Sequence, residues 1–329
     1  MGTGAALTPT TAGVLTGVLA LFLGSCELAE VVLAEPEDIP VMEMFLRAGD
    51  EQQFALLHRT LPGKDGTGFA VPDAIIRVTG PEGQEFLLNQ VHLSGCLETQ
   101  YYPVGAVGHG VLPSASVADG MPPPPGTCYA SLPDTEIHSG AIYHLEVALP
   151  DGRRMFGQTQ VPGSLNVIEP APDGHQCRLE PDTTLKVVWS TSDHAWAYML
   201  EVEFTGIRTA LADWDIAVPS DTLRLIGAAV SSEDTTSVFP TQMGLLERFG
   251  PDKEILLALQ DGLPPGITAD VTISAVDRNL VNWLRGGRFN PSGPVRVPSI
   301  SGDGTGVFGS MVPVTRRIMV GFGNAPPCQ

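Results

Sequence analysis

Residues 140–162 read GAIYHLEVALPDGRRMFGQTQVP, and they are the plainest indication of how this chain folds. Large apolar side chains alternate with polar or small ones over residues 142–149, which is typical of a strand with one buried face. The expected buried face carries Tyr143, Leu145, Val147 and Leu149. Asp151-Gly152 follows and supplies the positive φ that a tight turn needs, so the stretch predicts a β-hairpin.

The same reading extends toward the N-terminus. Residues 41–47 and 53–60 are strand-like and flank a short turn that contains Gly49 and Asp50. Residues 74–79 and 85–89 flank Gly80-Pro81-Glu82-Gly83 in the same way. Runs of β-favouring residues separated by such turn residues predict two more hairpins.

The strand pattern restarts after the polar, proline-rich residues 162–172, so we place a domain boundary near Gly163. Val187 and Trp189 share one face of the strand that follows. A Trp on an early strand, packed across the core, is typical of immunoglobulin-like and fibronectin-like sandwiches. Strands are expected at residues 185–190, 198–205, 223–230, 254–259 and 269–276, and short helices at 242–249 and 279–285, with Trp283 of the second helix over the core.

The predicted fold class is therefore all-β, with two immunoglobulin/fibronectin-like β-sandwich domains at residues 41–163 and 164–329 and a few short helices. The composition agrees, because 37 Gly and 29 Pro in 329 residues exclude a long-helix or coiled-coil protein. The formal net charge of −19 repels phosphate backbones, so no nucleic-acid partner is expected.

The N-terminus predicts export and a lipid anchor. Residues 12–24 form an uncharged apolar run that is too short to span a bilayer, which takes roughly 20 residues, but suits a signal peptide. It ends in Leu23-Gly24-Ser25-Cys26, which resembles the bacterial lipobox. We expect a lipoprotein signal peptide at residues 1–25, lipidation of Cys26 and an acidic tether at 26–40. The run lacks a preceding Lys or Arg, and the alternative is an ordinary secretory signal with an incidental Cys.

The other four cysteines are an even set, and in an oxidising compartment they allow three pairings. We favour Cys96 with Cys128 and Cys177 with Cys328, because that pairing keeps each bridge within one predicted domain. The first bridge would close the base of a long proline-rich insert at residues 97–127. A metal site using His92, Cys96, His175 and Cys177 is the weaker alternative, because the chain has no Cys-x-x-Cys spacing.

Motifs that carry chemistry are scarce. Residues 304–309 match G-x-G-x-x-G, but a dinucleotide site needs a helix after the glycines, and residues 312–320 read as a strand. Glycines that permit close packing at a sheet edge explain the motif better. No G-x-S-x-G, H-E-x-x-H or Walker sequence occurs. We therefore expect no cofactor, no bound metal and no catalytic residues.

Three aromatic residues near the strands of the second half are candidates for ligand contact. Trp196, Tyr198 and Trp214 would form a platform for a sugar or a peptide if their rings were exposed together. The alternative is that they pack in the core or in turns, which is the commoner use of such side chains.

Taken together, these features resemble a family of outer-membrane-associated lipoproteins of Gram-negative bacteria that is defined by a domain of unknown function. The resemblance rests on Cys26 and the tether, the hairpin 140–162, residues 185–204, residues 271–284 and SISGDGTGVFGSM at 299–311. It implies a β-sandwich protein at the membrane surface, often near TonB-dependent transporters. No catalytic residues are established for this family, so the resemblance assigns none.

The expected function is that of a lipid-anchored binding or accessory module at the bacterial outer membrane. A transporter complex or an envelope ligand would be the partner, and loops such as 97–127 would supply the contacts. The alternatives are a secreted hydrolase or carbohydrate-active enzyme with a site assembled from loops, and a purely structural spacer in an envelope assembly. An enzyme would show a concave pocket with convergent titratable groups.

Overall fold

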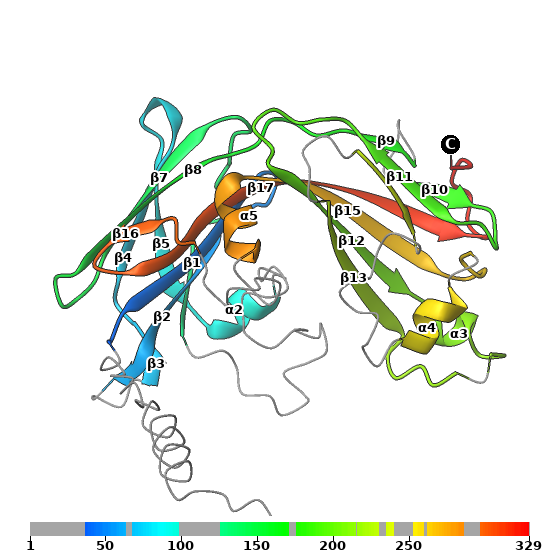
Figure 1. Ribbon diagram of the computed structural model, residues 1–329, viewed down its shortest axis with the longest axis horizontal. Helices are drawn as coiled ribbons and strands as arrows, with labels where there is room; N and C mark the ends of the chain where they lie inside the picture. The colour runs from blue at the N-terminus through cyan, green and yellow to red at the C-terminus, as the bar shows by residue number, and fades with distance from the viewer. Residues whose placement is uncertain are drawn as a thin grey trace, which may run out of the picture. The chain divides into compact units, whose positions relative to one another are not determined.

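Strands dominate the computed structural model (Figure 1). It describes residues 37–63, 68–98, 126–170, 176–214, 216–229, 235–239, 253–259, 262–285 and 297–328. The predicted signal peptide, Cys26, most of the tether, most of the insert 97–127 and the expected helix 242–249 lie outside these residues. Within them, no helix is both long and apolar enough to cross a membrane.

The first half of the chain contains all three predicted hairpins. β1 pairs antiparallel with β2, β4 with β5, and β7 with β8. The elements are β1 (Pro40–Arg47), β2 (Phe54–Gly63), β3 (Gly68–Ala70), β4 (Ile75–Thr79), the short 3₁₀-helix η1 (Pro81–Gly83), β5 (Glu85–Val91), α2 (Leu93–Glu98), β6 (Thr127–Ala130), β7 (Ile142–Ala148) and β8 (Arg154–Gln160).

Within the described residues, the second half continues with strands and three short helices. Its elements are β9 (Val167–Glu169), β10 (Gln176–Leu179), β11 (Leu185–Trp189), β12 (Ala197–Thr205), α3 (Ile207–Ala210), β13 (Thr222–Ala229), β14 (Thr236–Phe239), α4 (Lys253–Ala258), β15 (Thr268–Val276), α5 (Arg278–Arg285), β16 (Ile300–Gly302) and β17 (Thr305–Val320).

The strand predicted at residues 254–259 is wrong, because these residues lie in and just after the helix α4. Ile255 and Leu259 are both buried and lie four residues apart, which places them on one face of a helix. The Leu259 N–H donates to the Ile255 carbonyl at 3.0 Å. A short apolar run has no clear period, so periodicity alone does not distinguish a helix from a strand. Here the helix-favouring Leu and Ala residues favour the helix.

The 16-residue strand β17 connects the two halves of the chain. Its first part pairs in parallel with β1, and its later part pairs with β15 and β10. In the described residues the larger sheet has the order β13-β12-β15-β17-β1-β2-β6-β5-β4-β7-β8-β16. The domain boundary near Gly163 remains a prediction. β16 and the start of β17, predicted to belong to the second domain, pair with β8 and β1 of the first.

Side chains from facing strands fill the core of the first half. Met42 of β1, Val78 of β4 and Leu145 of β7 belong to one apolar cluster and are at most 2% exposed. The four alternating residues of β7 and its turn, Tyr143, Leu145, Val147 and Leu149, are buried as predicted. Each such side chain contributes about 1.5–3 kcal/mol when fully buried.

A second, three-stranded sheet of order β14-β11-β9 packs on the larger sheet. Trp189 of β11 meets Tyr198 of β12 edge to face, with ring centroids 5.6 Å apart and planes at 61°. Both rings are at most 2% exposed. The predictions that Trp189 packs across a sandwich core and that the fold is all-β with sandwich-like sheets are therefore confirmed. Trp283 of α5 is also buried, in a cluster with Phe45 and Leu280.

Candidate functional site

Two of the three predicted contact rings are exposed. Trp196 is 46% exposed, and the Arg278 guanidinium lies 5.1 Å from its ring centroid, a cation–π contact. Trp214 is 51% exposed in the turn after α3. Trp196 directly precedes β12, whereas α3 follows its far end, and the nine residues of this strand span about 30 Å. The two rings therefore do not form one platform.

The prediction that Tyr198 contacts a ligand is wrong, because this third ring is buried. Its side chain is 0% exposed, and its hydroxyl accepts the Ser192 N–H at 2.8 Å. It occupies the same face of β12 as Leu200, Val202 and Phe204, which are all buried. Side chains two residues apart in a strand share a face, so the core side of β12 includes Tyr198.

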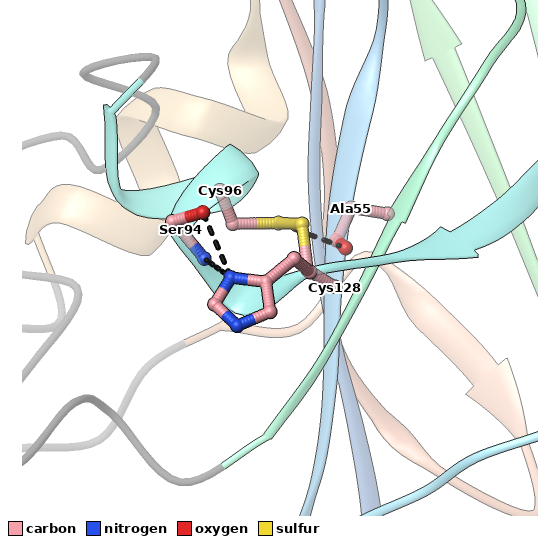
Figure 2. Close-up of a disulfide and its surroundings, with 5 residues drawn as sticks. Ala55, Ser94, Cys96 and Cys128 are labelled. Atoms are coloured by element: carbon pink, nitrogen blue, oxygen red, sulfur yellow. Dashed lines mark hydrogen bonds between the residues drawn. A yellow bond between two sulfur atoms is a disulfide. The ribbon is translucent and has the colours of Figure 1, made fainter.

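Both disulfides of the favoured pairing are present. Cys96 and Cys128 are buried, and Figure 2 shows their bridge joining α2 to β6. His92 precedes α2, and its Nδ1 accepts the Ser94 N–H at 3.3 Å. The sulfurs of Cys96 and Cys177, named in the metal alternative, are thus held in disulfides. Within the described residues, no group of three or more His, Cys, Asp or Glu side chains is placed to hold a metal ion.

The G-x-G-x-x-G sequence lies at the start of a strand, β17, where no helix N-terminus follows it. Gly306 has φ +123°, and a Cβ there would overlap the backbone oxygen of Met42 on the neighbouring strand β1. A Cβ at Gly304 would overlap the Met155 side chain. The glycines therefore permit close packing, as predicted, although in the middle of the sheet between β15 and β1 rather than at its edge.

A groove of about 720 Å³ lies beside β5, and we call it the β5 groove. Its lining comprises Gln84, Glu85, Phe86, Leu87, Asn89, Leu132, Pro133, Asp134, Thr135, Glu136 and His138. A smaller hollow of about 340 Å³ shares Leu87 and Asn89 with it. Large apolar side chains are exposed here, with Leu87 45%, Leu132 68% and Ile75 of the smaller hollow 60% accessible.

The β5 groove carries negative charge. Among the residues that the structure describes, its lining includes the carboxylates of Glu85, Asp134 and Glu136 and no Lys or Arg. Arg77 lies beside it, with its Nε 3.7 Å from a Glu85 oxygen, and His138 Nδ1 is 3.7 Å from a Glu136 oxygen. An acidic groove with exposed apolar side chains favours a ligand with basic and apolar groups.

The groove opens because the chain leaves the sheet after β6. Pro133 has no N–H to donate to a ladder, and Asp134 has φ +63°, so the strand cannot continue past this point. The departing chain is tied to the β1–β2 loop instead. Ser131 N–H donates to the Gln53 carbonyl at 2.8 Å, and Thr135 N–H donates to the Glu51 carbonyl at 3.1 Å. Residues 132–138 thus form the far wall of the groove.

A titratable group with a strongly raised pKa lies elsewhere, in the core. Asp277 is 3% exposed and precedes α5, where its Oδ1 accepts the Leu280 N–H at 2.9 Å as a helix N-cap. Thr159 Oγ1 donates to its other oxygen at 2.7 Å and lies 2.8 Å from Ser310 Oγ. Burial raises the pKa of Asp277 to about 6, although these hydrogen bonds oppose the shift. The carboxyl joins β8, β17 and α5 in the interior and lines neither of the two hollows described above.

No family model matches this chain, and no curated protein matches its sequence. Among solved structures it is similar to fibronectin(III)-like modules of Clostridium thermocellum CbhA, with 9% identity over 85% of this chain and 90% of that one and a TM-score of 0.21. A DUF4785 family protein of Legionella pneumophila is 16% identical over 70% of this chain and 51% of that one, with a TM-score of 0.21. Chicken CNTN1 FN1-FN3 domains are 9% identical over 84% and 66%, with a TM-score of 0.22. The fold assigned above rests on this chain's own strand pairings.

Proposed function

We propose that this chain is an extracytoplasmic binding or accessory module that contacts its partner through the β5 groove. The observation that carries the proposal is the exposure of Leu87 and Leu132 across an open groove at the point where β6 leaves the sheet. Exposed apolar side chains that share a depression mark interaction sites more often than scattered ones do. The groove belongs to rigid strands on one side and to a tied loop on the other, which suits recognition.

The two disulfides support the proposed compartment. Such bridges persist in oxidising environments, including the bacterial periplasm and cell surfaces. We place the protein at the outer membrane, held by acyl chains on Cys26 after removal of residues 1–25. Intact-mass measurement on protein made in its own cells should show a mature N-terminus at Cys26 with the added mass of the lipid. A Cys26→Ser variant should move to the soluble fraction, and an unmodified mature protein would refute the anchor.

The proposed partner is an envelope protein, with a TonB-dependent transporter complex as the specific candidate. Site-specific photo-crosslinking tests this in the native host, with the crosslinking side chain placed at Leu132 inside the groove. Ile168 of β9 is 47% exposed outside the groove and provides the matched control position. We expect a discrete adduct from Leu132 that is missing from Ile168. The same products from both positions, or none from Leu132, would refute the groove as the contact site.

A further inference from the structure

The β5 groove contains an open stretch of strand edge. β6 pairs with β5 only from Asn89 onward, so β5 residues 85–88 have β4 on one side and, within the described residues, no strand on the other. Continued in the same register, β6 would have placed Leu132 opposite Leu87 and Asp134 opposite Glu85. These are the residues that turn away into the far wall of the groove.

The direction of the open hydrogen-bonding groups follows from the ladder. Gly80 N–H donates to the Gln84 carbonyl at 2.7 Å, so residues 80 and 84 are a hydrogen-bonded pair between β4 and β5. Such pairs alternate along antiparallel strands, so Phe86 and Leu88 also bond to β4. Glu85 and Leu87 then direct their N–H and C=O groups away from β4 into the groove. The bonding of β6 agrees with this alternation. Ser131 N–H bonds to Gln53 of the β2 side, so the backbone groups of the preceding residue, Ala130, face β5.

We infer that the β5 groove binds an extended segment of a partner protein as an added strand, and that this segment alternates basic and apolar side chains. The inference rests on the proposed function and specifies its binding mode. Strand addition would satisfy the four backbone groups of Glu85 and Leu87, which supplies affinity without sequence preference. Glu85 and Leu87 share one face of β5, where the carboxylates of Glu85, Asp134 and Glu136 select basic side chains, while the half-buried Phe86 on the other face provides the apolar contact.

A single substitution separates backbone pairing from side-chain contact. Leu87→Pro removes the N–H that faces the groove and places the proline ring in the path of an added strand. The bonds between β4 and β5 are made by Phe86 and Leu88, so the hairpin should persist. Leu87→Ala is the matched control, because it removes the same side chain and keeps the N–H. Glu85→Gln combined with Glu136→Gln tests the charge.

The probe is a fluorescent hexapeptide of alternating Lys and Val, used with the full chain. Two further peptides are controls: one with Glu in place of Lys, and one N-methylated on the backbone amides of one edge. We expect saturable binding of the Lys peptide, at least about tenfold weaker binding for Leu87→Pro than for Leu87→Ala, and a comparable loss on N-methylation. The amide hydrogens of Glu85 and Leu87 should gain protection from exchange when the Lys peptide binds.

The outcomes separate this inference from the proposed function. Equal binding by Leu87→Pro and Leu87→Ala, equal binding of the N-methylated or Glu peptide, or no saturable binding up to about 1 mM overturns strand addition. If Leu132 still gives a discrete adduct in cells, the groove remains a contact site with another binding mode. If Leu132 captures nothing there, the proposed function fails as well. If the Leu87→Pro chain does not fold, as shown by the loss of its cooperative unfolding transition, binding of the N-methylated peptide to the unmodified chain decides between strand addition and another binding mode.

Discussion

Asp277 gives the sharpest test of the core. Its pKa is raised from 3.8 to about 6 in the folded chain because burial disfavours the charged carboxylate. A folded-state pKa above the unfolded value means that the folded chain binds the proton more tightly. The stability that this proton contributes is fully present below pH 3.8 and is lost as the pH rises through 6. The shift of about 2 pH units corresponds to about 3 kcal/mol.

Asp277→Asn removes this titration and retains the shape of the side chain. The amide oxygen can still accept the Leu280 N–H. The amide nitrogen can donate to Thr159 Oγ1, as a protonated carboxyl would, whereas the carboxylate accepts from it. Every other carboxyl group titrates alike in both proteins. The difference in unfolding free energy, variant minus wild type, should therefore rise by about 2.5 kcal/mol between pH 4 and pH 8, because the unfolded carboxyl is already partly ionised at pH 4.

Urea unfolding at half-unit steps of pH, with the disulfides intact, measures this difference. The carboxyl carbon of Asp277 should also titrate near pH 6 by NMR. Thr159→Val serves as a directional control, because loss of the hydroxyl that donates to the carboxylate should move that titration to higher pH. A difference in stability that stays constant from pH 4 to pH 8 would show that Asp277 does not ionise in this window and would refute the reasoning.

Three further predictions concern packing and cross-links. Gly306→Ala should lower the free energy of unfolding by about 3 kcal/mol or more, because its Cβ would overlap the Met42 backbone. Gly49→Ala, at φ +88° with open space around it, should lower it by about 1–2 kcal/mol. Urea midpoints of both variants measure these costs, and equal costs would contradict the prediction. Loss of Cys177–Cys328 should destabilise the fold by about 5 kcal/mol and loss of Cys96–Cys128 by about 4 kcal/mol, because the first bridge closes the longer loop, with sequence separations of 151 and 32. Unfolding of the two paired Cys→Ala variants measures this, and the reverse order would count against this reasoning. Trp189→Phe should cost about 1 kcal/mol and Trp189→Ala about 3–5, because the buried indole Nε1 makes no hydrogen bond within the described residues; thermal melts distinguish the two.

Local pattern was sufficient for the hairpins and for most of the core. The alternation in residues 142–149 and the Asp-Gly turn are short-range signals. A tight turn pairs the strand before it with the strand directly after it, so the partner strand also follows from the sequence. Tyr198 could also have been placed correctly, because it has the parity of Leu200 and Val202 on β12. Trp196 is exposed because it lies before the first residue of β12, so the alternation that buries Tyr198 does not extend to it.

The role of β17 could not be read from the sequence. Its parallel pairing with β1 joins residues more than 260 positions apart, such as Val41 and Thr305, and no turn residue marks such a contact. The glycines at 304–309 were recognisable as unusual. Their function in letting β17 approach β1 depends on which backbone lies opposite, which only the register supplies.

The β5 groove escaped prediction for a related reason. Pro133 and Asp134 are readable as a turn, and Glu85 to Leu87 are readable as part of a strand. The groove exists because residues 132–134 leave the sheet instead of pairing with residues 85–87. A local sequence pattern indicates that a segment is a strand, but it does not indicate which strand lies beside it. The hydrogen bonds of Ser131 and Thr135 to the β1–β2 loop hold the departing chain away. An open edge maintained in this way, with carboxylates around it, is protected against self-association by charge repulsion between copies of an acidic chain. The same charges leave the edge accessible to a basic strand.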